Sequence, residues 1–134
     1  SVLEFELAGS VAYRLYITGD TLVIDDLKEL PRRYPDLDLA LLHLGGTRVM
    51  GILVTMDAAQ GVEMLRLVDP RRAIPIHFDD YDVFTSPLSD FKQAVAAAGL
   101  ADRVGYLDRG ETYGFGPRAE TTGRPAGEAA VAST

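Results

Sequence analysis

The segment DLALLHL, Asp38–Leu44, decides the fold, because it is a compact apolar run that ends directly in Gly45 and Gly46. An apolar run of this length, closed by turn residues, is typical of a strand buried inside a sheet. We therefore predict a buried strand here. The segments on either side of it indicate what surrounds that strand.

Two strands and a short helix are expected before the buried strand. Val2–Leu7 and Val11–Thr18 are rich in β-branched and aromatic residues, and the short connection Ala8–Ser10 would join them as a hairpin. Asp26–Leu30 predicts a short helix. Pro31 should prevent that helix from running on, because proline cannot continue a helical hydrogen-bond pattern.

A helix and another strand are expected after it. Thr47–Thr55 is ambiguous between strand and loop. Asp57 is a good N-cap, and it precedes Ala58–Val68, whose apolar residues fall on one helical face. Ala73–Phe78 predicts a further strand. Pro75 places that strand at a sheet edge, or marks the strand's end, because proline cannot donate to a central ladder.

The last elements complete an α/β pattern. Ser86 followed by Pro87 predicts a helix start, with serine as the cap and proline at the first helical position, and Gly99 should close the helix. Arg103–Leu107 and Thr112–Phe115 predict a final hairpin. A hairpin, strand–helix units and short strands, in this order, predict an α/β fold with helices packed on a sheet.

Composition limits the classes of function. The 134 residues suffice for one domain with a core, and residues 117–134, poor in large apolar side chains, predict a disordered tail. A net charge of -7 argues against nucleic acid as a partner and against a basic membrane-surface protein. No apolar run approaches the ~20 residues of a membrane span, so we expect no membrane partner and a cytoplasmic location. With no cysteine, any metal must rest on histidine and carboxylate ligands.

Three candidate site residues stand at strand ends. Asp20 follows the first strands in YITGDT, Tyr16–Thr21, while His43 and His77 close two later strands and are the chain's two histidines. Functional groups of open α/β sheets gather at the carboxyl ends of strands, and aspartate with histidine suits a divalent metal. Each residue also has a simpler interpretation. Asp20 can be a turn residue, and each histidine can be a packed core side chain.

Three further polar residues are candidates, and two of them, Asp79 and Tyr81, lie close in sequence to His77. Asp57 lines a helix start and is most simply a cap, while Asp79 and Tyr81 follow His77 in an acidic loop. A metal bound beside them would lower the pKa of its water toward ~7 and polarise the oxygen under attack. We therefore treat Asp57, Asp79 and Tyr81, together with His43, as candidate substrate-binding residues.

Three segments together resemble the C-terminal half of a metallo-β-lactamase superfamily hydrolase. They are YITGDT, DLALLHLGG and TMDAAQGVEMLRLVDPRRAIPIHF. The resemblance covers residues 13–115, and it is closest to the branch that includes ascorbate-phosphate lactonases and related metal-dependent hydrolases. It implies that residues 1–116 form half of a four-layer αβ/βα sandwich, a mixed sheet with helices on one face.

The resemblance also implies roles for individual residues. The aspartate of the family's Gly-Asp motif matches Asp20 and bridges two metal ions, and the histidine that ends the late strand matches His77 and binds one of them. Both would therefore be metal ligands and catalytic residues. The cofactor implied is two zinc ions, with manganese or iron as alternatives. The reaction implied is cleavage of an ester, lactone, amide or phosphodiester bond of a small-molecule substrate by metal-activated water.

The chain departs from the family pattern in two respects. A metal-binding histidine that normally precedes the family's Gly-Asp strand is absent here. The family's His-x-His-x-Asp-His motif belongs to the N-terminal half, and no such run occurs here. We therefore expect the other ligands to come from a missing N-terminal half or a partner chain, and this chain to be inactive in isolation.

Two other functions are compatible with the pattern. A half-sandwich exposes an apolar face, so the chain could instead be a non-catalytic interaction or dimerisation module that forms a homodimer. A receiver-like signalling domain would need a lysine at a late strand end. Lys28 and Lys92 both fall in predicted helices, which argues against that class.

Overall fold

The computed structural model describes residues 1–46, 48–50, 52–78 and 87–117. The elements are β1 (Val2–Leu7), β2 (Ser10–Ile17), η1 (Asp25–Glu29), α1 (Leu30–Arg33), β3 (Leu39–His43), β4 (Arg48–Val49), β5 (Ile52–Leu53), α2 (Ala58–Val68), β6 (Arg72–Ile76), α3 (Leu88–Ala97) and η2 (Ala101–Arg103). The predicted tail, apart from Pro117, lies outside the described residues, as does Ser86, the predicted cap of the last helix.

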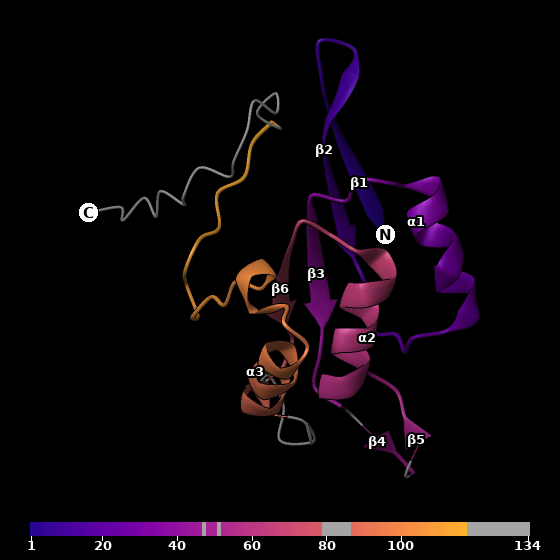
Figure 1. Cartoon of the computed structure of the whole chain (residues 1–134), viewed down its shortest axis with the longest axis vertical. Coiled ribbons are helices and arrows are strands. Elements are labelled where there is room, and N and C mark those ends of the chain that lie inside the picture. The colour runs from indigo at the N-terminus through magenta and orange to yellow at the C-terminus, as the bar shows by residue number, and fades with distance from the viewer. Residues whose placement is uncertain (47, 51, 79–86, 118–134) are drawn as a thin grey trace.

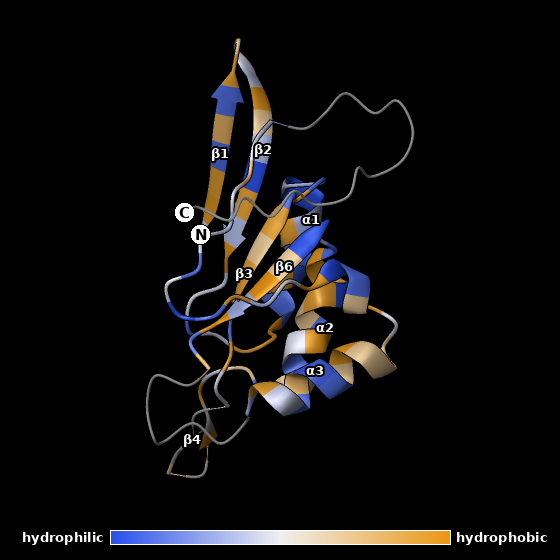
Figure 2. Cartoon of the chain, turned by 90° about the vertical axis from the view of Figure 1, so that its left-hand side faces the viewer, coloured by the Kyte–Doolittle hydropathy of each residue, from blue (hydrophilic) through white to orange (hydrophobic). Residues whose placement is uncertain are grey.

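A mixed sheet of four strands organises the chain, in the order β1-β2-β3-β6. β1 and β2 form an antiparallel hairpin, whereas β2, β3 and β6 run parallel to one another. In Figure 1 these three strands point the same way, and Figure 2 shows α1, α2 and α3 on one side of the sheet. This confirms the predicted α/β fold, a mixed sheet with helices on one face.

The main core lies between the helices and the sheet. Leu42 of β3 and Met64 of α2 are fully buried, and Phe91 of α3 is 1% exposed. Burying each such side chain stabilises the fold by roughly 1.5–3 kcal/mol. β3 is central and apolar on both faces, which confirms the expectation from its sequence.

The opposite face of the sheet is covered by the C-terminal segment instead of a hairpin. Leu107 and Tyr113 pack on the cluster that Tyr13 forms with its neighbours in the sheet, and Phe115 stacks on Tyr13 with ring centroids 4.7 Å apart. Val104 forms a single bridge to Ala73. The predicted final hairpin is therefore wrong, because the apolar side chains of this segment pack on the sheet.

Two local predictions are also corrected, and a segment that the sequence left open between strand and loop is assigned. The first helical segment is η1 followed by α1, which passes through Pro31, because the N–H that proline lacks would be unpaired in a first turn anyway. The last helix begins at Leu88, one residue later than expected, with Pro87 in the cap position. The ambiguous segment after β3 contains the short antiparallel pair β4–β5.

Three other local predictions are confirmed. Asp57 caps α2, because its Oδ1 accepts the backbone N–H of Gln60 at 3.0 Å. Pro75 lies in β6, which stands at the end of the strand order. Gly99 ends the helix with a φ of 71°, a left-handed conformation that glycine adopts without strain.

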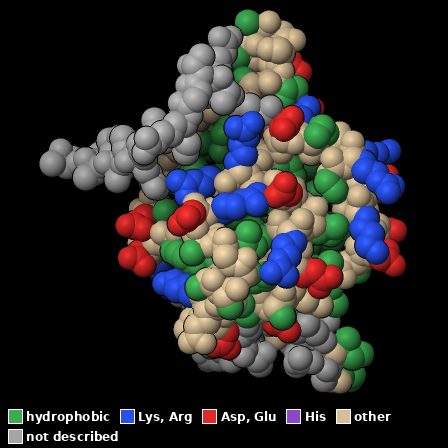
Figure 3. Space-filling model, viewed as in Figure 1, with side chains coloured by type: hydrophobic (Ala, Val, Ile, Leu, Met, Phe, Trp, Pro, Cys, Tyr) green, Lys and Arg blue, Asp and Glu red, His purple; other side chains and the backbone are tan. Residues whose placement is uncertain are grey.

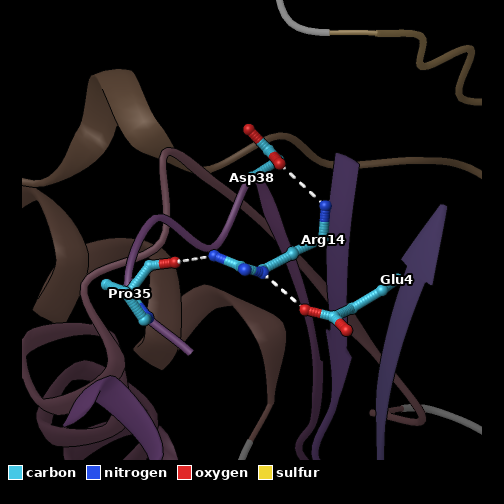
Figure 4. A network of polar contacts seen from close by, with 4 residues as sticks. All are labelled: Glu4, Arg14, Pro35 and Asp38. Carbon is cyan, nitrogen blue, oxygen red and sulfur yellow. Dashed lines mark hydrogen bonds and ion pairs between the residues drawn. The ribbon is translucent and has the colours of Figure 1, made fainter. Parts of the chain in front are cut away.

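A polar network connects the β1–β2 hairpin to the residues just before β3 (Figure 4). The Arg14 guanidinium donates to Glu4 Oε1 at 2.8 Å and to the Pro35 carbonyl at 2.5 Å. Asp38 is 4% exposed, and its Oδ2 accepts the backbone N–H of Arg14 at 2.7 Å. The buried carboxylate thus satisfies a backbone donor that no ladder hydrogen bond reaches in this irregular stretch.

The helix-covered side presents an ordinary charged surface. Figure 3 shows Lys and Arg side chains interspersed with Asp and Glu across this view, without a patch of one sign. Among the helices of the described residues, none has the length and apolar character needed to cross a bilayer.

Candidate metal centre

The parallel strands bring the three strand-end candidates to one edge of the sheet. Ile17 pairs with Leu41, and His43 pairs with Ile76, so β2, β3 and β6 end at nearly the same level. Asp20 and His77 follow β2 and β6 at this edge. Asp20 Oδ1 lies 3.7 Å from His77 Nδ1.

His43 belongs to the same group of side chains. Its ring centroid lies 5.5 Å from that of His77, with the ring planes tilted by 44°. The sequence therefore identified residues that are separated by up to 57 positions but meet in space. Neither histidine is a fully buried core residue, since His43 is partly exposed and the His77 side chain is 27% exposed.

Backbone conformation directs both ligand candidates out of their strands. Gly19 has a φ of 65°, which turns the chain sharply between the end of β2 and Asp20. His77 itself has a φ of 58°, in the left-handed region that side chains rarely adopt, although histidine is one of the types that tolerate it. Strained backbone of this kind clusters at functional sites, so the conformation of His77 supports a role beyond packing.

Thr18 is a site residue that the sequence analysis missed. Its Oγ1 accepts the backbone N–H of His43 at 2.9 Å and lies 3.4 Å from His43 Nδ1. The sequence feature that could have identified Thr18 is a hydroxyl side chain at the end of a predicted strand, directly before a Gly-Asp turn.

Burial favours the neutral form of His43. Burial lowers the pKa of His43 below the usual 6.5, the Asp20 carboxylate opposes this shift, and His77 adds to it. His43 is therefore uncharged at neutral pH. Asp20, with 62% of its side chain exposed, is the acidic group that faces the two rings.

Asp20 and His77 fit two positions of a metal site. Ligands bound at about 2.1 Å in tetrahedral geometry stand about 3.4 Å apart, close to the observed 3.7 Å between Oδ1 and Nδ1. Within the part of the chain that the structure describes, no group of three or more His, Asp or Glu side chains is placed to hold an ion. The pair therefore fits a metal site as part of its ligand set.

Of the predicted substrate-binding residues other than His43, only Asp57 lies within the described residues. Asp57 uses its carboxylate to cap α2, which begins at the end of the molecule where β3 ends (Figure 1). Asp79 and Tyr81 lie outside the described residues.

The comparisons with known proteins agree with this geometry. No family model matches the chain. A UPF0173 metal-dependent hydrolase from Archaeoglobus fulgidus is 37% identical over 102 residues, which are 76% of this chain and 41% of that protein. The chain thus spans about two fifths of the length of the curated relatives it matches.

Solved structures give the same assignment. Igni18, a metallo hydrolase from Ignicoccus hospitalis, superposes with a TM-score of 0.62 and 28% identity, over 77% of this chain and 42% of that one. An isothiocyanate hydrolase from Delia radicum gut bacteria superposes with a TM-score of 0.69 over 80% of this chain and 41% of that one, and at 16% identity it supports the fold alone. In sequence and in fold, the chain is therefore similar to part of proteins named as metal-dependent or metallo hydrolases.

Proposed function

We propose that the complete protein is a metal-dependent hydrolase and that Asp20 and His77 supply part of its metal site. The observation that carries the proposal is their 3.7 Å approach at the edge where β2 and β6 end. The left-handed backbone of His77 and the relatives named metal-dependent hydrolases support it further. The remaining ligands come from the part of the protein beyond the described residues.

Asp20 and His77 would help to hold the metal, which we propose is two zinc ions, with manganese or iron as alternatives. When bound, it would supply an activated water for cleavage of an ester, lactone, amide or phosphodiester bond. Asp20 would contribute its carboxylate oxygens as ligands. His77 would contribute a ring nitrogen, and its Nδ1 lies 3.7 Å from Asp20 Oδ1.

Substrate contacts come from the residues around this pair. His43 is neutral and stands beside His77, so its ring can donate a hydrogen bond to a small-molecule substrate. Asp57, at the start of α2, together with Asp79 and Tyr81, would line the entrance. Of these residues, His43 has the closest described approach to the ligand pair.

The test is metal binding and hydrolysis by the complete protein with Asp20→Ala or His77→Ala. We expect each variant to bind less zinc by elemental analysis and to lose hydrolysis of a panel of ester, lactone, amide and phosphodiester substrates. Asp102→Ala is the matched control, because Asp102 is exposed in η2 and its carbonyl accepts from Arg72, at the opposite end of β6. Near-normal hydrolysis in either site variant would show that the assignment is wrong.

An interaction module is the second candidate, because apolar side chains of β1 remain exposed. Leu3 is 45% exposed, Phe5 41% and Leu7 58%. We propose that this face packs against the rest of the complete protein, and that a homodimer forms only when that part is absent. Sedimentation velocity of the complete protein and of the 134-residue chain tests this proposal. We expect the complete protein to be monomeric and the 134-residue chain to self-associate. A monomeric 134-residue chain at high concentration would contradict the dimer.

A further inference from the structure

The Thr18 hydroxyl occupies the place where the hydrogen-bond ladder between β2 and β3 changes. The Thr18 N–H donates to the Leu41 carbonyl at 3.1 Å, as a regular parallel ladder requires. The next bond of that ladder would join the His43 N–H to the Thr18 carbonyl. The His43 N–H donates to Thr18 Oγ1 instead, at 2.9 Å, because the chain turns away at Gly19.

The same hydroxyl faces the imidazole of His43. Its Oγ1 lies 3.4 Å from Nδ1, a long hydrogen bond of the kind that tightens when a site is completed. A threonine hydroxyl has one proton and two lone pairs, and one lone pair already accepts the His43 N–H. Among the hydrogen bonds of the described residues, the hydroxyl proton has no acceptor other than Nδ1.

The proton count favours one tautomer of His43. If Nδ1 carries no proton, it accepts the hydroxyl proton and both groups are satisfied. If Nδ1 carried the proton, the hydroxyl would have to accept two N–H groups, and its own proton would lack an acceptor. Leaving a partly buried donor unsatisfied is unfavourable, so the first arrangement is preferred.

We propose that Thr18 is a positioning residue that fixes neutral His43 as the tautomer with its proton on Nε2. The Nε2–H is then the donor of this ring, beside His77, and suits a carbonyl or phosphoryl oxygen of the substrate. This use of the donor rests on the proposed hydrolase. The tautomer assignment does not depend on that proposed function.

The experiment is a long-range proton–nitrogen correlation spectrum of the complete, zinc-loaded protein with 15N-labelled histidine, recorded at pH 8. His43→Gln identifies the signals of His43. We expect Nδ1 to show the shift of an unprotonated nitrogen and Nε2 that of a protonated one. Thr18→Val, which keeps the shape and removes the hydroxyl, should move the ring to a mixture of tautomers, while Thr18→Ser should retain the original tautomer.

Other spectra would overturn the proposal. These are a wild-type His43 protonated at Nδ1, a zinc ion bound to its Nε2, or a Thr18→Val spectrum unchanged from wild type. If Thr18→Val does not fold, the wild-type spectrum decides, because it fixes the tautomer without any variant.

Hydrolysis gives a separate readout. We expect Thr18→Val to lower kcat by about 10–100-fold, the range for groups that orient a site histidine, and Thr18→Ser to restore it. A kcat unchanged in Thr18→Val would overturn the use of Nε2–H as a substrate donor. A wild-type protein that cleaves no substrate of the panel would remove the proposed function and leave the tautomer assignment intact.

Discussion

Replacing Gly61 with alanine should destabilise this domain, although alanine is the better helix former. Gly61 lies inside α2, where that helix packs against Phe91 of α3. An added Cβ would stand 2.8 Å from Phe91 Cε2 and 2.9 Å from Leu44 Cδ2, and separations below 3.0 Å require a neighbour to move. Phe91 is 1% exposed and Leu44 is 2% exposed, so neither side chain has free space to enter.

The size of the effect follows from two opposing contributions. Glycine to alanine inside a helix stabilises by roughly 0.5–1 kcal/mol, because glycine loses more backbone entropy on folding. Forcing an extra methyl group into a packed core costs about 1–3 kcal/mol. Since two enclosed side chains obstruct the methyl group, we take the upper part of that range. The free energy of unfolding should therefore fall by about 1–2 kcal/mol.

Urea unfolding followed by circular dichroism measures this difference. With a denaturant slope of about 1–3 kcal/mol/M, the midpoint should fall by about 0.5–1 M while the slope stays the same. Ala59→Gly is the matched control, because Ala59 is exposed in the same helix and reports helix propensity alone. A Gly61→Ala protein as stable as the parent, or more stable, would refute the argument that α2 and α3 are in tight contact here.

Two further predictions concern buried polar groups. Asp38→Ala should lower the free energy of unfolding by about 1–3 kcal/mol, because it leaves the Arg14 N–H without its acceptor. Asp38→Asn should lower it by less, because asparagine keeps an acceptor oxygen. Equal urea midpoints for the two variants would contradict this prediction. Burial, helped by charges on Tyr113 and Asp38, raises the pKa of Tyr13 to about 12, so folding favours the neutral phenol. Its stabilising contribution should be constant below pH 10 and decline between pH 10 and 12, and Tyr13→Phe should flatten that part of the stability profile measured by urea unfolding.

Local sequence patterns predicted most of the elements, because the signals that start and stop them are local. The Asp57 cap, the apolar face of α2 and the buried run of β3 depend on residues within a few positions, and the structure confirms all three. The final segment shows where such reasoning stops. Leu107 and Tyr113 belong to segments whose local pattern predicts strands. The surface that they cover includes Tyr13, about a hundred positions earlier, so no local pattern indicates it.

The candidate site divides in the same way. The sequence determined that Asp20, His43 and His77 stand at strand ends, because a glycine turn and the end of an apolar run can be identified from neighbouring residues. Only the tertiary structure decided which strand ends are adjacent, because strand order and parallel register depend on contacts between distant segments. It also decided that Asp20 comes within 3.7 Å of His77, and that the Thr18 hydroxyl replaces a carbonyl as the acceptor for His43. Distances of this kind are set by packing across the sheet, and no local pattern encodes them.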